Sequence, residues 1–194
     1  MSVDLKIYDE KFYKNAGQII APSVQSVVTI LIKYFNPKSV IDIGCGNGLY
    51  LAEFMKAGKE VLGFDGSPAA IKISSVANKI KLFDLTQSLR LNRHFDLCLC
   101  IELAEHLPLV AADTLIKSLT SLSNNLVFTA ATPGQGPKSI GHINEQPHQF
   151  WIKKFKAYTF AYNKKLTHII KREMEQAKVV WWLSKNLMIF QKHD

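Results

Sequence analysis

Three glycines at alternate positions follow a short β-rich run and are the most distinctive chemical feature of this sequence. The run VIDI at positions 40–43 leads into Gly44, Gly46 and Gly48. Glycine lets the main chain turn tightly and lets a ligand approach it closely, because no Cβ stands in the way. The spacing G-x-G-x-G differs from the G-x-G-x-x-G of dinucleotide binders, and no Gly-Lys-Ser/Thr follows as in a P-loop. A site for bound pyrophosphate is therefore less favoured.

Two aspartates follow later β-rich runs. Asp65 ends the run 60–65, about 20 residues after Gly46, where a carboxylate can accept hydrogen bonds from both hydroxyls of a ribose. Asp84 follows the run 79–83 and could accept a hydrogen bond from an adenine amino group. Either acid alone would be an ordinary loop residue or helix cap. Combined with the glycines at three strand ends, they predict an adenosine site.

A second group of reactive side chains comes later in the chain. Glu102, Glu105 and His106 follow the apolar run 95–101, and His142 lies in a loop rich in polar residues. Two carboxylates and an imidazole could hold a divalent cation, with His142 as the fourth ligand. The spacing does not define that set of ligands, so we predict no metal site. Alternatively, Glu105 and His106 only shape the loop beside the predicted adenosine site, and Glu102 faces solvent.

His142 is the main candidate for a general base, because an imidazole titrates near neutral pH. The alternative is that His142 and Asn144 cap the next helix and order the loop. We take His142, His106 and Glu105 as the candidate catalytic residues.

The elements that must position these residues alternate between strands and helices. Hydrophobic spacing and turn residues predict strands at 39–43, 60–65, 79–83, 95–101, 125–131, 157–162 and 186–191, and helices at 16–36, 48–56, from Ser67-Pro68 onward, 108–122, 147–156 and 163–176, with a loop at 132–137. This alternation predicts an α/β fold with a mostly parallel sheet and helices on both faces. Ligands of such sheets bind beyond the carboxyl ends of the strands.

The length of 194 residues fits a single domain, 1–194, in which 1–36 form an N-terminal helix and lid region. No apolar run approaches the roughly 18 residues that span a membrane, and the acidic start is unlike a signal peptide. Three cysteines are too few for a disulfide framework, so we expect a cytoplasmic location. Cys98 and Cys100 share one face of a strand, and we expect them, like Trp181 and Trp182, in the core.

The run 39–51 resembles motif I of the class I S-adenosylmethionine-dependent methyltransferases. Asp65 and Asp84 are similar to the acids after the second and third strands of that family, and 95–108 is similar to its fourth-strand motif. These motifs cover residues 37–131. The resemblance implies a Rossmann-like three-layer sandwich whose seven-stranded, mostly parallel sheet has an antiparallel last strand. The loop after the fifth strand resembles small methyltransferases of the type-11/23 grouping.

The resemblance also implies the residues that hold the cofactor. The glycines would line its methionine part, Asp42 would help hold the loop, and the full set would be Asp42, Gly44, Cys45, Gly46, Gly48, Asp65, Gly66, Asp84, Leu85 and Ile101. Aromatic residues near the N-terminus fold over the cofactor in members of the family. Tyr8, Phe12 and Tyr13 therefore either form a lid or pack against the sheet edge.

The leading hypothesis is an enzyme that moves a methyl group from S-adenosylmethionine to an oxygen or nitrogen of a small molecule, such as a natural product, glycan or quinone-like acceptor. The run from Glu102 to His106 also resembles the metal-binding run of RNA 2′-O-methyltransferases. With the net charge of +8, it supports RNA as a second acceptor class. That hypothesis needs the late basic residues to form a continuous stripe beside the cofactor pocket. A third hypothesis is a non-catalytic adenosine-binding module.

Overall fold

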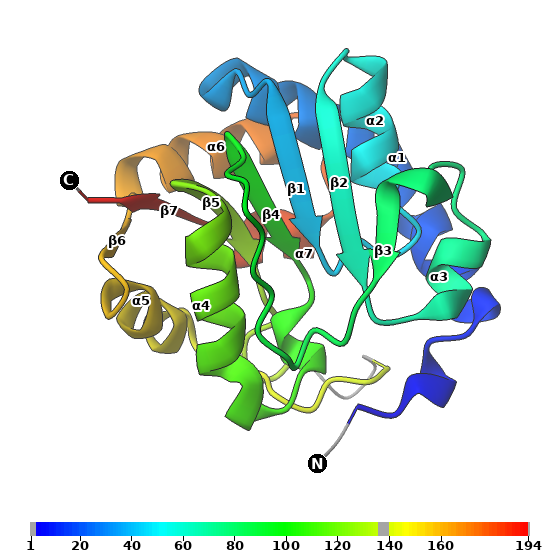
Figure 1. Ribbon diagram of the computed structural model, residues 1–194. Helices are drawn as coiled ribbons and strands as arrows, with labels where there is room; N and C mark the ends of the chain where they lie inside the picture. The colour runs from blue at the N-terminus through cyan, green and yellow to red at the C-terminus, as the bar shows by residue number, and fades with distance from the viewer. Residues whose placement is uncertain (1–2, 136–139, 194) are drawn as a thin grey trace.

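A computed structural model describes residues 3–135 and 140–193 (Figure 1). The predicted loop 132–137 therefore extends in part beyond the described residues. The strands are β1 Ser39–Ile43, β2 Glu60–Asp65, β3 Ile80–Leu82, β4 Leu97–Ile101, β5 Asn125–Thr129, β6 Phe160–Tyr162 and β7 Met188–Lys192. The helices are α1 Glu10–Phe35, α2 Leu49–Lys56, α3 Pro68–Lys72, α4 Ala112–Leu122, α5 His148–Lys156, α6 Lys164–Gln176 and α7 Trp181–Asn186.

The strands form one seven-stranded sheet in the order β3-β2-β1-β4-β5-β7-β6. Strands β1 to β5 pair in parallel, and β7 runs antiparallel to both β5 and β6. The fold class and the antiparallel last strand are thus confirmed. The strand order reverses direction between β1 and β4, and this is the point at which open α/β sheets bind their ligands.

The sheet lies between two helical layers because successive side chains of a strand point to opposite faces. Val40 packs with α1, α2, α6 and α7, whereas Ile41 packs with α4 and α5. Figure 1 shows α1, α2 and α6 on one side of the sheet and α4 and α5 on the other. Both layers therefore bury strand residues, as the apolar composition of β4 predicts.

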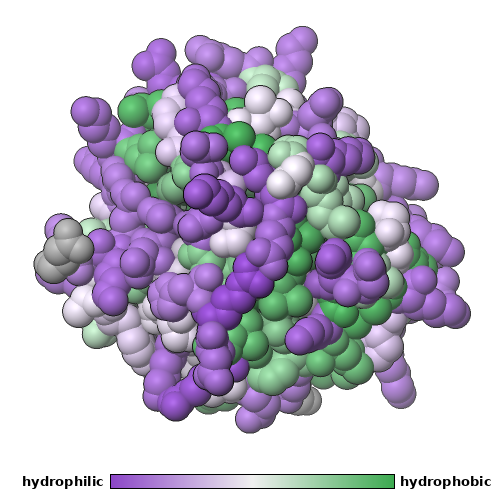
Figure 2. All heavy atoms as spheres, turned by 45° about the horizontal axis from the view of Figure 1, so that its top comes forward, coloured by the Kyte–Doolittle hydropathy of each residue, from purple (hydrophilic) through white to green (hydrophobic). Residues whose placement is uncertain are grey.

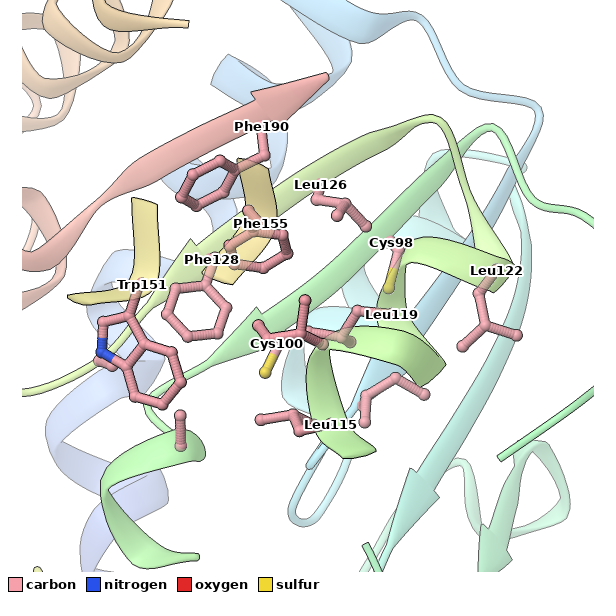
Figure 3. Close-up of a cluster of buried hydrophobic side chains, with 14 of the residues drawn as sticks. Cys98, Cys100, Leu115, Leu119, Leu122, Leu126, Phe128, Trp151, Phe155 and Phe190 are labelled. Carbon is pink, nitrogen blue, oxygen red and sulfur yellow. The ribbon is translucent and has the colours of Figure 1, made fainter. Parts of the chain in front are cut away.

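The core on the side of α4 and α5 contains the two strand cysteines that were predicted to be small core residues. Figure 3 shows Cys98 and Cys100 beside the leucines of α4. Both thiols are buried, and the ring of Phe155 stacks on that of Phe190 with centroids 3.9 Å apart. Burial raises the pKa of both thiols. These cysteines therefore serve packing.

Most elements differ from the sequence prediction by a few residues at their ends, and two helices differ more. Helix α1 begins at Glu10, because Asp9 caps it by accepting a hydrogen bond from the Phe12 amide at 2.7 Å, so Phe12 and Tyr13 lie inside this helix. Helix α7 was not predicted at all. It leaves Trp181 60% exposed, so the prediction of a core position is wrong for Trp181, whereas Trp182 is partly buried.

Helix α1 also differs in another respect. Contrary to the sequence analysis, its 26 residues are long and apolar enough to cross a membrane, by length and composition alone. In the structure this helix packs against α2 and α6, and residues such as Val27 and Leu31 are fully buried. Helices in the core of a protein can also meet these criteria of length and composition. On the face shown in Figure 2, the largest hydrophobic area lies at the lower right, a smaller one lies at the upper left, and hydrophilic side chains cover most of the rest.

Candidate active site

A cavity of about 950 Å³ lies beyond the carboxyl ends of β1, β2 and β4. It is at the upper end of the range for ligand pockets, so it has room for a nucleoside and a second molecule. The glycine loop after β1, the turns after β2 and β3, the segment after β4 and the N-terminal residues from Val3 to Ile20 contribute to its wall. Figure 1 shows the N-terminal segment on this side of the sheet.

The glycine loop has a backbone conformation that requires glycine. Gly44 has a φ of +78°, and a Cβ there would lie 2.8 Å from the side chain of Leu103. Gly46 has a φ of +54°, and its amide donates to Asp65 Oδ2 at 2.8 Å. The loop is therefore tied to the end of β2. Gly48 also has a φ of +78°, as the N-cap of α2, but it does not belong to the described cavity wall, contrary to its predicted place in the cofactor site.

Asp65 lies in the cavity wall, but its carboxylate already has partners. Oδ1 accepts hydrogen bonds from the Ser67 amide at 2.8 Å and from the Tyr13 hydroxyl at 3.3 Å. Burial raises the pKa of Asp65, and these donors oppose that rise. A carboxylate accepts about four hydrogen bonds, so both ribose hydroxyls would bind if the Tyr13 hydroxyl moved away while the Gly46 and Ser67 amides stayed in place.

The other residues predicted to hold the cofactor also line the cavity, namely Asp42, Gly44, Cys45, Gly46, Gly66, Asp84, Leu85 and Ile101. Asp84 is exposed, and its Oδ1 accepts from both the amide and the hydroxyl of Thr86 at 2.9 and 2.7 Å. These bonds lower the pKa of Asp84. It is therefore charged at the mouth of the cavity.

Asp42 does not hold the loop, contrary to the sequence interpretation. Neither oxygen of its buried carboxyl group has a hydrogen-bond partner within the described part of the chain. Burial, and then the charge of Asp65, raise the pKa of Asp42 to about 8. A buried acid without partners is costly, and one that lines a cavity is well placed to accept hydrogen bonds from a cationic ligand.

The opposite side of the cavity holds His106, whose ring meets that of His142 edge to face. His142 itself does not belong to the described cavity wall. The centroids of His106 and His142 are 4.8 Å apart. The hydroxyl of Tyr8 and Nδ1 of His106 share a hydrogen bond of 2.9 Å, and Nδ1 of His142 lies 2.8 Å from Oε1 of Glu145. Burial and His142 lower the pKa of His106 to about 4, so that its ring is neutral at pH 7. The Glu145 carboxylate fixes the orientation of the His142 ring.

Glu105 connects this loop to the sheet. Its side chain is fully buried, Oε1 accepts from the Ala131 amide at 3.1 Å, and Oε2 has no partner among the described residues. Its main-chain oxygen accepts from the amides of Ile143 and Asn144. Burial and the nearby carboxyl group of Glu102 raise the pKa of Glu105 well above its usual range. The two carboxyl groups therefore form one coupled buried pair.

Glu102 lines the cavity and is partly exposed, and it does not simply face outward into solvent as one alternative expected. It has a φ of +50°, and its Oε1 accepts from Asn186 Nδ2 at 3.1 Å. Burial raises the pKa of Glu102. A non-glycine residue in this backbone region is strained, and such strain concentrates at functional sites.

The alternative role of His142 and Asn144, to cap the next helix and order the loop, is confirmed only in part. Asn144 is buried and donates to the Ala104 main-chain oxygen at 3.2 Å, so it orders the loop. It does not cap α5, whose N-cap is Pro147 and which has no side-chain cap in the described structure. His142 does not cap it either, because its ring pairs with Glu145.

One ligand atom from each of Glu105, His106 and His142 lies within 4.8 Å of the other two. The acid supplies a buried oxygen without a partner, and Tyr8 and Glu145 bond to Nδ1 of the two imidazoles. Partners of this kind orient metal-binding histidines. The donor set therefore fits a divalent cation, although the sequence analysis predicted none.

The sequence analysis did not identify Glu145 as the partner of His142 or Asn186 as the partner of Glu102. Glu145 was noted only as part of a polar loop, and Asn186 only as the start of a strand. The histidines outside the site are exposed: His94, His168 and His193. Of the late basic residues, none belongs to the described wall of the cavity: Lys153, Lys154, Lys156, Lys164, Lys165, Lys171, Arg172 and Lys178.

The chain was compared with known proteins. Residues 20–177 match the model of a family described as "Methyltransferase domain". A ubiquinone biosynthesis O-methyltransferase of Nitrosomonas europaea is 30% identical over 130 residues, which are 62% of this chain and 54% of that protein. The chain thus spans about half the length of this relative.

Two solved structures are similar in fold. The sugar N-methyltransferase KedS8 from Streptoalloteichus has a TM-score of 0.66 at 14% identity, covering 95% of this chain and 92% of that one. An O-methyltransferase of a polyketide synthase from Brevibacillus brevis, in complex with S-adenosyl-L-homocysteine, has a TM-score of 0.62 at 15% identity, covering 88% and 71%. These identities support the fold alone.

Proposed function

Since this chain belongs to the methyltransferase-domain family, we propose that it transfers a methyl group from S-adenosylmethionine to an oxygen or nitrogen of a small molecule. The observation that carries the proposal is that one cavity joins the glycine loop and Asp65 on one side to His106 on the other, and that the ring of His106 contacts that of His142. Cofactor and acceptor would then meet between the two sides.

The cofactor side supplies complementary groups for each part of the molecule. Asp65 would accept hydrogen bonds from the ribose hydroxyls and Asp84 from the adenine amino group. The partnerless carboxyl group of Asp42 would receive the ammonium of the methionine part. The bare backbone of Gly44 and Gly46 would allow close approach.

When bound, S-adenosylmethionine supplies a methyl group already activated on a sulfonium, so the chain mainly has to position the acceptor. Glu145 holds the His142 ring in one orientation, and His142 takes the proton that the acceptor oxygen or nitrogen loses as it gains the methyl group. His106 stays neutral, because its pKa is about 4, and helps to shape the wall of the acceptor site.

The mouth of the cavity supports an acceptor with an apolar portion. Leu5, Leu82 and Val110 line the cavity and are 56%, 57% and 90% exposed. Ile140 is also exposed and lies beside Gly141, whose main-chain oxygen accepts from Tyr8. Water-exposed apolar side chains around a pocket mark a binding surface. A quinone-like or natural-product acceptor suits this surface better than a bare glycan.

A second candidate function is metal-assisted 2′-O-methylation of RNA, which the cluster of Glu105, His106 and His142 favours. A divalent cation held there would lower the pKa of an acceptor hydroxyl. The distribution of the late basic residues gives this candidate less support. A non-catalytic adenosine-binding module is the third. We also propose a cytoplasmic location, which the three free, buried cysteines support.

The test begins with calorimetry of S-adenosylhomocysteine binding, followed by transfer of a labelled methyl group to quinone-like, sugar and RNA acceptors. Binding with transfer to a small molecule in EDTA supports the leading proposal. Transfer to RNA that requires Mn²⁺ or Mg²⁺ supports the second candidate. Binding with no transfer to any acceptor supports the third, and no binding of the cofactor product contradicts all three.

A further inference from the structure

Three basic side chains on three helices lie outside the cavity wall, and two of them act electrostatically on the third. His148 is the first residue of α5, Lys171 lies in the middle of α6, and Lys185 lies near the end of α7. Nζ of Lys171 donates to the main-chain oxygen of Lys185 at 2.8 Å, which fixes α6 and α7 relative to one another. The charges of Lys171 and Lys185 both act on His148 and, after burial, lower its pKa.

The cluster lacks the negative charge that would balance it. Within residues 3–135 and 140–193, no carboxylate forms an ion pair with any of the three, and only Glu175 acts electrostatically on Lys171. His148 Nε2 is buried and has no hydrogen-bond partner among those residues. Burial lowers the pKa of Lys171. A buried ring nitrogen without a partner beside two ammonium groups leaves a polar position that a ligand can satisfy.

Nearby features favour an anion further. The first turn of α5 adds the positive end of a helix dipole beside His148. The ring of Trp181 lies 5.5 Å from Nζ of Lys185 and is exposed, so it can cover one side of a bound group. Ammonium groups are common phosphate binders, and a phosphate provides two negative charges and several acceptor oxygens.

We propose that His148, Lys171 and Lys185 form a binding site for a phosphate group. This site is distinct from the cavity but adjoins its acceptor side, because Lys185 precedes Asn186, which donates to Glu102. His148 likewise follows the loop that carries His142. The phosphate belongs either to an acceptor that extends out of the cavity or to free inorganic phosphate.

The direct probe is inorganic phosphate, which replaces chloride in steps so that the ionic strength stays constant. NMR follows the ring resonances of His148 during the titration. The signals are assigned with the variant His148→Gln. We expect saturable shifts with a Kd of about 1–10 mM, and the double variant K171M/K185M to weaken binding at least ~tenfold. The matched control is K164M/K165M, which removes the same charge from exposed positions of α6. It should bind phosphate within about twofold of the unmodified protein.

Absence of a saturable shift at His148 would overturn the proposal, and so would equal weakening in the two double variants, which would show a diffuse charge effect. Binding of S-adenosylhomocysteine is measured on every variant to check folding. If the unmodified protein did not bind S-adenosylhomocysteine, that result would contradict the proposed function and not the phosphate site. A sugar phosphate monoester that binds more tightly than inorganic phosphate when S-adenosylhomocysteine is present identifies the acceptor as the source. Equal affinities identify free phosphate.

Discussion

The two sides of the cavity are built in different ways. On the cofactor side, Gly46, Asp65 and Ser67 are close in the chain and bond to one another through main-chain amides. On the acceptor side, Tyr8 bonds to His106, which is 98 residues away, and to Gly141, which is 133 residues away. Local geometry sets the first side, whereas the second requires that distant loops fold against each other.

The difference predicts how each side responds to substitution. A change on the cofactor side should alter binding of S-adenosylmethionine and leave the acceptor groups in place. A change on the acceptor side should alter turnover with little effect on cofactor affinity. Substitutions at four positions test this separation.

Replacing His142 with Ala removes the proposed base and should lower turnover by roughly 100-fold or more, which is the usual contribution of general base catalysis. Cofactor affinity should change by less than about twofold, because no predicted cofactor group contacts this ring. Steady-state kinetics and calorimetry measure the two quantities. The exposed His168, replaced with Ala, is the control. Unchanged turnover in His142→Ala would remove this residue from the mechanism.

Replacing Asp65 with Ala should weaken binding of S-adenosylmethionine by about 100-fold, because charge-assisted hydrogen bonds to the ribose and to the Gly46 amide are lost. Calorimetry measures the loss, and circular dichroism checks that the fold remains. Asp113→Ala is the matched control, since that carboxylate is exposed and pairs with Lys154 at the surface. Retained affinity in Asp65→Ala would exclude this carboxylate from the cofactor site.

Glu145→Gln removes the charge that orients the His142 ring and should lower turnover roughly tenfold, less than loss of the ring itself. Glu145→Asp should recover part of the loss, because it restores a carboxylate. If both variants matched the unmodified protein in kcat, Glu145 would have no positioning role. A large fall in cofactor affinity would instead contradict the separation of the two sides.

Asp42→Asn should have the smallest effect on binding, a loss of several-fold, and an opposite effect on stability. The pKa of Asp42 is raised to about 8 in the folded chain, so the folded state holds a proton that the unfolded state loses above about pH 4. Stability of the free protein therefore falls as pH rises from about 4 to about 8. The variant should remove this contribution and raise Tm at pH 8. A lower Tm at pH 8 would show that the carboxylate stabilises the fold.

Much of the fold and of the cofactor side could be predicted from the sequence. The order of strands along the chain follows from apolar runs between turn residues, and only glycine suits the backbone at Gly44 and Gly46. The limits of elements were less certain. A cap at Asp9 starts α1 early, and α7 has no periodic pattern long enough to predict a helix.

The sequence by itself determined the kind of sheet, the glycine turn and the acids that follow β2 and β3, because these depend on residues near one another in the chain. The packing of distant segments leaves Asp42 without a hydrogen-bond partner among the described residues, and it brings Glu102 against Asn186 and Glu145 against His142. Burial and pairing depend on how separate segments pack, and the free energy of a charge changes with both. No local pattern encodes which distant side chain will fill that position.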